Sequence, residues 1–324
     1  MTNFRKRSVR ALRRPFEWLG IGLGVALMAN LPRRGLLALC DFVSAVMYRF
    51  DRRGRREALF NLRAVLGRPT PPSFKQLDYL PTAAEERIIR RSYRNMARTV
   101  GHAFWTCRRA AARVKASGTM DAACRAYLAA HRPAVTVSGH IGCWEILSQL
   151  AQLEGHTMMS VAKDIGSGGM TKLLMRARRS IGQEIVPAEG AFKPLLAGLR
   201  AGKSLGLLVD QVVKPKNGGI WVRFFGRPVP VSAAPAFFAA KCKAPILVAW
   251  SRPLKDGRYR CEVVDTIPAA EARDIWATTQ RCTRDLERIV RRHPSCWVLN
   301  YNFFSNRPRK EDLEALAERE AKSV

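Results

Sequence analysis

His140 and Glu145 stand five positions apart in the segment SGHIGCWE, after a short apolar run and before a helical pattern. An imidazole at the end of a buried strand can accept a proton as a general base. A carboxylate in the first turn of a helix is stabilised by the amino end of that helix, and it can accept a hydrogen bond from one ring nitrogen. The spacing therefore predicts that His140 is a general base and that Glu145 orients it. The alternative is structural: a packing histidine and a helix-start carboxylate.

The elements that must position this pair follow from an alternation of short apolar runs and helical patterns that begins at residue 133. Strands are expected at 134–138, 157–162, 204–209, 220–225 and 246–250, with an edge strand at 258–265. Helices are expected at 144–153, 170–181, 192–200, 233–241 and 271–292. The alternation predicts an α/β fold with a mostly parallel sheet flanked by helices. Sites in such sheets lie at the carboxyl ends of strands, so the loops 139–144, 163–169, 210–219 and 226–232 are expected around one site.

The N-terminal 50 residues read as a separate, membrane-anchoring helical segment. Six basic residues precede an apolar stretch at 18–31, and a second apolar stretch covers 35–48. Each is shorter than the ~20 residues that span a bilayer squarely. We expect insertion as a short helix or a shallow hairpin, or attachment to the surface; two core helices are the alternative. Residues 51–305 then form the catalytic α/β domain, and 306–324 form a charged tail.

The chain is strongly basic, with 56 Lys and Arg against 26 Asp and Glu and a net charge of +30. Such an excess needs an anionic partner, either an anionic membrane face or a nucleic acid. Nucleic acid is the weaker alternative, because the sequence has no zinc-finger spacing, RNA-binding sheet signature or strip of arginines and aromatics. The eight cysteines form no C-x-x-C pair and no Cys/His cluster with zinc spacing, which predicts reduced thiols and no metal site.

Five segments in series resemble the bacterial lauroyl/myristoyl acyltransferases of lipid A biosynthesis, within the lysophospholipid acyltransferase superfamily. The segment HIGCWE is similar to the first block of that family, H-x-G-N-W-E. The other four are Arg178 with Gly182, Val209-Asp210-Gln211, Val222–Pro228 with its F-F-G string, and Ala244-Pro245-Ile246. The resemblance implies a glycerol-phosphate-acyltransferase-like fold. It also implies transfer of a fatty acyl group from a thioester to a lipid hydroxyl.

The resemblance further implies roles for particular residues and partners. His140 would take the hydroxyl proton and Glu145 would orient it, while Arg178 and Lys163 would meet a phosphate of acceptor or donor. Asp210, Gln211 and Gly226 would shape the substrate cleft. The donor would be acyl carrier protein or coenzyme A, with no cofactor beyond this acyl thioester. The acceptor would be a glycolipid, most plausibly a lipid A precursor, at the cytoplasmic face of the inner membrane.

Several positions leave alternatives open. Cys143, where the family usually has Asn, reads as a small packing residue rather than an acyl-carrying nucleophile. Arg178 could belong to a solvated basic face, and Asp210 could be a turn residue. The last family block is expected to hold two tryptophans and a basic residue, but this chain keeps only Trp297 of these. Acceptors such as a phosphatidylinositol mannoside, an ornithine lipid, a lysophospholipid or a polyene lipid therefore stay open, as does a non-catalytic scaffold.

Overall fold

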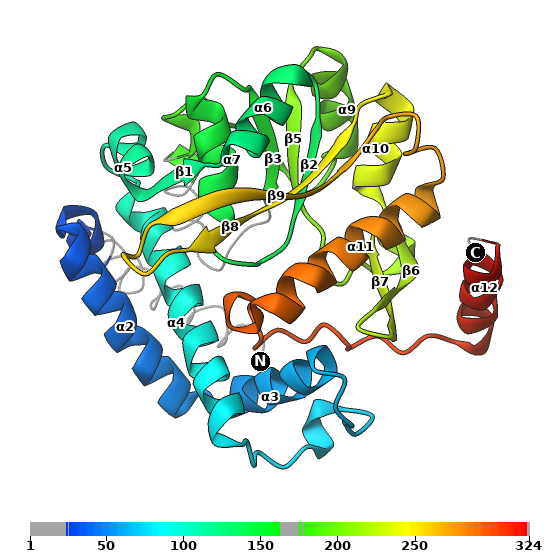
Figure 1. The fold of residues 1–324 in the computed structure, drawn as a ribbon, viewed down its shortest axis with the longest axis horizontal. Coiled ribbons are helices and arrows are strands. Elements are labelled where there is room, and N and C mark those ends of the chain that lie inside the picture. The colour runs from blue at the N-terminus through cyan, green and yellow to red at the C-terminus, as the bar shows by residue number, and fades with distance from the viewer. Residues whose placement is uncertain (1–23, 25, 163–174, 177, 323–324) are drawn as a thin grey trace, which may run out of the picture.

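A seven-stranded sheet forms the centre of the molecule in the computed structural model, which describes residues 24, 26–162, 175–176 and 178–322 (Figure 1). The strand order is β1-β9-β8-β2-β5-β3-β4. The strands are β1 (Gly118–Met120), β2 (Val135–Ser138), β3 (Met158–Ala162), β4 (Glu184–Pro187), β5 (Ser204–Leu208), β8 (Ile246–Pro253) and β9 (Tyr259–Ile267). All neighbouring strands pair in parallel except β8 and β9. The predicted α/β fold with a mostly parallel sheet is therefore confirmed.

Helices cover both faces of this sheet. One face carries α5 (Ala110–Ser117), α6 (Ala122–Ala130) and α7 (Trp144–Leu153), and the other carries α9 (Phe192–Arg200), α10 (Ala234–Cys242) and α11 (Ile275–Arg292). Strand β2 is buried along its whole length, with Val135 and Val137 in the larger core together with Leu205 and Leu207 of β5. Burial on both faces explains why the sequence of such a strand is a continuous apolar run.

Two expected features of the sheet are wrong. The strand expected at 258–265 does not form an edge, because β1 pairs with β9 on its outer side. Strand β1 was not predicted, because its three residues are too few to show the alternating pattern of a strand. The expected loop 226–232 contains β7 (Arg227–Ser232), which pairs with β6 (Gly219–Phe224) in a separate hairpin. Phe225 and Gly226 form its two-residue turn and both have positive φ, at 51° and 74°, as a type I′ turn requires.

The N-terminal part of the described chain is helical and packs beside the sheet. It comprises α2 (Arg33–Phe50), α3 (Arg52–Val65), a short 3-10 turn η1 (Phe74–Gln76) and α4 (Ala83–Trp105). Helix α2 lies along α4 (Figure 1). Helix α4 is followed by α5, and the two are separated by a turn in which Arg109 has a φ of 53°. In the described chain, no helix combines the length and the apolar character needed to cross a bilayer.

Two further expectations concern the ends of the chain. Half of the apolar stretch 18–31, namely residues 18–23 and 25, lies outside the described residues, so the insertion of this stretch stays a prediction. The charged tail contains α12 (Lys310–Ala321), which is joined to β6 by an ion pair between Arg223 and Glu320 at 2.9 Å. The 3-10 turns η2 (Pro215–Asn217) and η3 (Pro294–Cys296) complete the described elements. Turn η3 leads into Trp297, which the next section places beside His140.

Candidate active site

His140 lies directly beyond the carboxyl end of β2, and its ring is held by Asp210 at the end of the adjacent strand β5. The Nδ1 atom of His140 is 2.8 Å from Asp210 Oδ1, and the backbone N–H of His140 donates to Asp210 Oδ2 at 2.9 Å. An ionised carboxylate only accepts hydrogen bonds, so Nδ1 carries the proton and Nε2 keeps its lone pair. The His140 side chain is 21% exposed and that of Asp210 is 1% exposed. A base with a reachable Nε2 is therefore backed by a buried carboxylate.

Trp297 fixes the same carboxylate from the other side. Its indole N–H donates to Asp210 Oδ2 at 2.9 Å, and its ring is fully buried. The ring stacks on Phe303 with a centroid distance of 4.0 Å. Asp210 thus accepts from the His140 ring, the His140 backbone and Trp297, which leaves it little freedom to turn. An orienting carboxylate needs this kind of fixed geometry.

Glu145 does not occupy the role predicted for it. It lies in the first turn of α7 as expected, but its carboxylate binds the guanidinium of Arg178, with Arg178 Nε donating to Oε2 at 2.9 Å and Nη2 donating to Oε1. The orienting hydrogen bond on His140 comes from Asp210 instead. The reason is the strand order: β5 is the direct neighbour of β2, so Asp210 reaches Nδ1 from the next strand. The Glu145 charge still acts on His140 through space.

The pKa values follow from this arrangement. Burial lowers the pKa of His140, but the charge and hydrogen bond of Asp210, with a smaller effect from Glu145, more than offset it, so the pKa lies above its ordinary value. Burial raises the pKa of Asp210, but His140 and Trp297 outweigh it and keep the carboxyl ionised at a lowered pKa. Burial likewise raises the pKa of Glu145, but the charge and hydrogen bonds of Arg178 outweigh it, so the Glu145 pKa lies below its ordinary value.

The loop that carries His140 is held to its surroundings through its backbone. Gly142 has a φ of +64°, and a Cβ at this position would lie 1.8 Å from the carbonyl oxygen of Ser251, so only glycine fits. The Gly142 N–H donates to Cys296 O at 2.8 Å, and Thr99 Oγ1 of α4 donates to Gly142 O at 2.9 Å. Ser251 Oγ donates to Cys143 O at 2.6 Å. Contacts from α4, β8 and η3 therefore fix the position of the loop that carries the imidazole.

Cys143 is fully buried, and burial raises the pKa of its thiol to about 12. A thiol with such a pKa is protonated at neutral pH and makes a poor nucleophile. This supports the packing role over the acyl-carrying one. None of the eight cysteines forms a disulfide in the described structure.

The remaining predicted site residues are placed as follows. Gln211 Nε2 lies 3.4 Å from His140 Nε2, at the reactive side of the imidazole. Gly226 forms the turn of the β6–β7 hairpin, next to Phe225, whose ring packs on Trp297 at 5.5 Å. Lys163 lies outside the described residues. Substrate-binding roles for these residues, and for Arg178, stay predictions.

The sequence analysis assigned Asp210 only to the wall of the substrate cleft. It named Trp297 only as the one tryptophan that this chain keeps from the last family block. Their joint role was missed, because it depends on β5 lying beside β2 and on the chain after η3 returning to the same place. The available signals were the indole N–H of Trp297, which can donate a hydrogen bond, and the position of Asp210 at the end of an apolar strand. The sequence position of neither residue shows which residue it contacts.

Comparison with known proteins agrees with the geometry. Residues 2–304 match the family described as bacterial lipid A biosynthesis acyltransferase, which confirms the resemblance drawn from the motifs. A curated relative, the phosphatidylinositol mannoside acyltransferase of Mycobacterium tuberculosis (strain CDC 1551 / Oshkosh), is 27% identical over 180 residues. That match covers 53% of this chain and 54% of the relative, so this chain spans about half of the relative's length. The chain belongs to the family of bacterial lipid A biosynthesis acyltransferases.

Proposed function

We propose that this protein transfers a fatty acyl group from a thioester to a hydroxyl of a membrane glycolipid, with His140 as the general base and Asp210 as the residue that orients it. The observation that carries the mechanism is the 2.8 Å contact between His140 Nδ1 and Asp210 Oδ1, which leaves the lone pair of the ring on Nε2, beside Gln211 Nε2 at 3.4 Å. Family membership supports the reaction class.

The chemistry follows from this tautomer. His140 Nε2 takes the proton of the acceptor hydroxyl while its oxygen attacks the thioester carbonyl carbon. Asp210 stabilises the imidazolium that forms. When the tetrahedral intermediate collapses, the C–S bond breaks, and the imidazolium returns its proton to the leaving thiolate. An ester and a free thiol result, and His140 is neutral again. A positioned base of this kind contributes roughly 10²–10⁴ in rate.

Replacement of the base tests the mechanism. His140→Ala should lower acyl transfer by at least 10²-fold while the folded state survives, because the side chain is partly exposed and lies at a loop. His156→Ala is the control, since His156 follows α7, 16 positions beyond His140, and its Nδ1 makes no hydrogen bond within the described structure. Wild-type rates in purified His140→Ala would rule the mechanism out.

For the acceptor, we propose a glycolipid such as a lipid A precursor, which the family description supports. A phosphatidylinositol mannoside is the second candidate, because the curated relative is named for that acceptor. For the donor, acyl carrier protein is acidic and suits the +30 chain, and coenzyme A is the alternative. Mass spectrometry of lipids from cells with and without the gene separates the acceptors, since one lipid should lose the mass of one acyl group.

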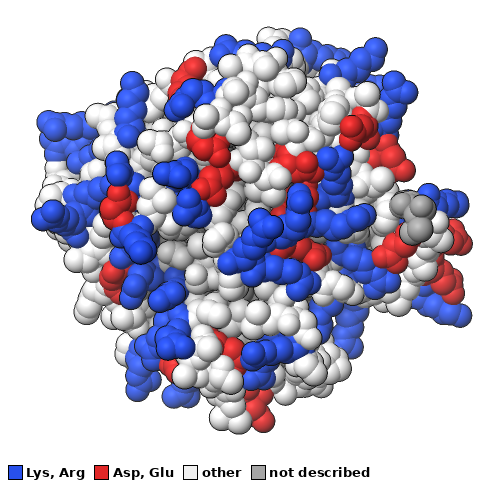
Figure 2. Space-filling view, viewed as in Figure 1, with Lys and Arg blue, Asp and Glu red and all other residues white. Residues whose placement is uncertain are grey.

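For the location, we propose that α2 rests on the cytoplasmic face of the inner membrane. Five apolar side chains on one face of α2 are exposed to solvent: Phe42, Val43, Val46, Met47 and Phe50. Exposed arginines lie at or just beyond both ends of the helix: Arg34, Arg49, Arg52 and Arg56. An apolar face edged by cations is the pattern of a helix that lies in an anionic membrane interface. On the face shown in Figure 2, Lys and Arg cover more of the surface than Asp and Glu do.

A further inference from the structure

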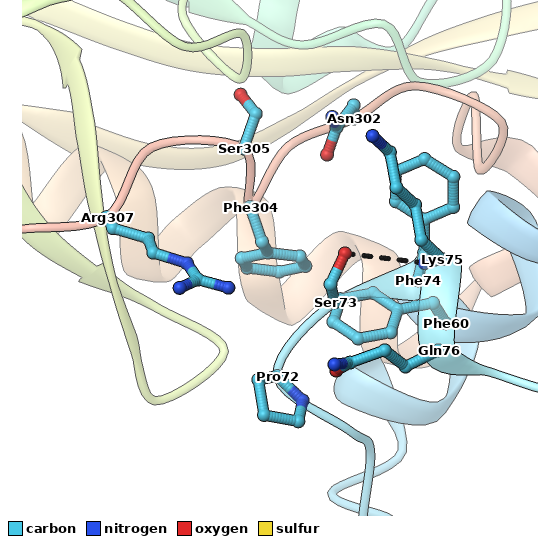
Figure 3. A pocket seen from close by; sticks show the side chains of 10 residues that line it. All are labelled: Phe60, Pro72, Ser73, Phe74, Lys75, Gln76, Asn302, Phe304, Ser305 and Arg307. Carbon is cyan, nitrogen blue, oxygen red and sulfur yellow. Dashed lines mark hydrogen bonds between the residues drawn. The ribbon is translucent and has the colours of Figure 1, made fainter.

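A pocket of about 500 Å³ lies away from His140, between the α3–η1 region and the chain after Trp297 (Figure 3). Its apolar lining consists of Phe60, Phe74, Phe304 and Pro72. Its polar lining consists of Ser73, Lys75, Gln76, Asn302, Ser305 and Arg307. Among the described residues, no acidic side chain lines the pocket, whereas two cationic side chains do. The pocket therefore combines aromatic surface with positive charge and hydrogen-bonding groups.

The two cations that line this pocket have no protein partner among the residues that the structure describes. Some arginines of the described chain, such as Arg63, Arg98 and Arg281, form ion pairs with carboxylates. Within that part of the chain, neither the Lys75 ammonium nor the Arg307 guanidinium makes a hydrogen bond or an ion pair. In Figure 3 the two side chains lie on either side of the Phe304 ring. Two unpaired cations beside an aromatic ring favour an anionic ligand with a flat or apolar part.

A third cation lies behind the aromatic wall. The Arg227 guanidinium is 5.0 Å from the ring centre of Phe60 and 5.3 Å from that of Phe304. The two rings contact each other edge to face at 6.0 Å. Arg227 thus keeps the rings in place and adds to the positive potential.

The pocket is held open by hydrogen bonds and is joined to the active site. Asn61, next to Phe60, donates from its side chain to Leu299 O and Tyr301 O, each at 2.7 Å, and so fastens α3 to the segment that forms the opposite wall. In that segment, Phe303 stacks on Trp297, which donates to Asp210. Phe304 follows directly and lines the pocket. The segment 297–304 therefore contacts both the Asp210 carboxylate and the pocket.

We propose that this pocket binds the phosphate-bearing part of a substrate, with the phosphate between Lys75 and Arg307 and a ring of the same substrate against Phe304. The inference rests on the proposed function, which supplies two sources of such chemistry. One is the nucleotide end of an acyl-coenzyme A, and the other is a phosphorylated sugar of the acceptor lipid. Both present a phosphate attached to a ring system.

Binding to the full-length protein tests the proposal without any turnover. Adenosine 3′,5′-bisphosphate represents the donor and glucosamine 1-phosphate the acceptor, each titrated calorimetrically at fixed salt. We expect one of them to bind, and Lys75→Ala/Arg307→Ala to weaken it at least tenfold, because two charge-assisted contacts are lost. Lys115→Ala/Arg273→Ala removes one exposed lysine and one exposed arginine elsewhere and should bind as the wild type does.

The outcomes separate the two proposals. If neither phosphate binds the wild type at millimolar concentration, or if the pocket variant binds as well as the wild type, the pocket has no phosphate site. If phosphate binds but purified wild-type protein transfers no acyl group, the pocket stands and the proposed function falls. In an active enzyme, the pocket variant should raise KM for the substrate that carries the phosphate at least tenfold, with kcat changed far less. A fall in kcat with an unchanged KM would contradict the proposal.

Discussion

Asp210 accepts hydrogen bonds from His140 Nδ1 and from Trp297 Nε1 on its two separate oxygens, at 2.8 and 2.9 Å. The base and the tryptophan are 157 positions apart in the sequence, and one buried carboxylate joins them. This arrangement gives Asp210 two effects on His140: it selects the tautomer and it raises the pKa. Both effects can be measured.

Asp210→Asn should lower kcat/KM by at least 10²-fold, because an amide cannot stabilise the imidazolium and can present the wrong tautomer. The base works only when it is neutral, so activity falls as the pH drops through the His140 pKa. That pKa is raised in the wild type, mainly by Asp210, so removing the charge moves the acid limb to lower pH. The pH dependence of kcat/KM checks this. An unshifted acid limb would show that Asp210 does not act on the base.

Trp297→Phe keeps an aromatic ring against Phe303 but removes one donor from Asp210. Loss of a hydrogen bond to a buried charge should lower the free energy of unfolding by about 1.5–3 kcal/mol. The activity should also fall, since the carboxylate is less firmly held. Trp276→Phe is the matched control, because Trp276 donates at the same 2.9 Å to a backbone carbonyl, that of Trp221. The control should lose about 1 kcal/mol and keep its kcat. Equal effects on kcat in both variants would contradict the role of Trp297.

Glu145 and Arg178 form a largely buried pair, with side chains 12% and 15% exposed. Removing either partner leaves the other charge without compensation, which should cost about 3–5 kcal/mol of unfolding free energy. The double variant Glu145→Ala/Arg178→Ala should cost clearly less than the sum of the two single changes. The control is Arg125 with Glu154, a pair at 3.0 Å whose arginine is exposed to solvent, where the coupling should be much smaller. Additive effects at Glu145 and Arg178 would mean that the pair contributes no coupling energy.

The pH dependence of kcat/KM in two amide variants distinguishes the two acidic residues of the site. Glu145→Gln should shift the acid limb of kcat/KM less than Asp210→Asn does, because Glu145 acts on His140 only through space whereas Asp210 touches the ring. A larger shift of the acid limb in Glu145→Gln than in Asp210→Asn would instead support Glu145 as the residue that orients His140, as the sequence spacing predicts.

A helix or strand of this fold could be predicted from the sequence where the signals for it lie within a single stretch of the chain. The helix expected at 144–153 is α7, with the same bounds, since its apolar spacing and flanking glycine lie in one stretch of sequence. The partner of His140 was not predictable, because it depends on which strand lies beside β2. Glu145 is nearest in sequence, but Asp210 is nearest in space. Strand order is set by the whole sheet, and no local pattern contains it.

The apolar face of α2 yields the last prediction. Phe42 and Phe50 are 67% and 75% exposed, and burying a phenylalanine side chain in an apolar environment stabilises by roughly 1.5–3 kcal/mol. Phe42→Glu/Phe50→Glu should therefore weaken binding to anionic phospholipid vesicles by at least tenfold, measured by co-sedimentation of the full-length protein. Leu80→Glu/Leu313→Glu also places two acids at exposed apolar positions, away from α2, and should bind nearly as the wild type does. If both double variants bind equally well, attachment depends on another part of the chain and α2 does not lie in the interface.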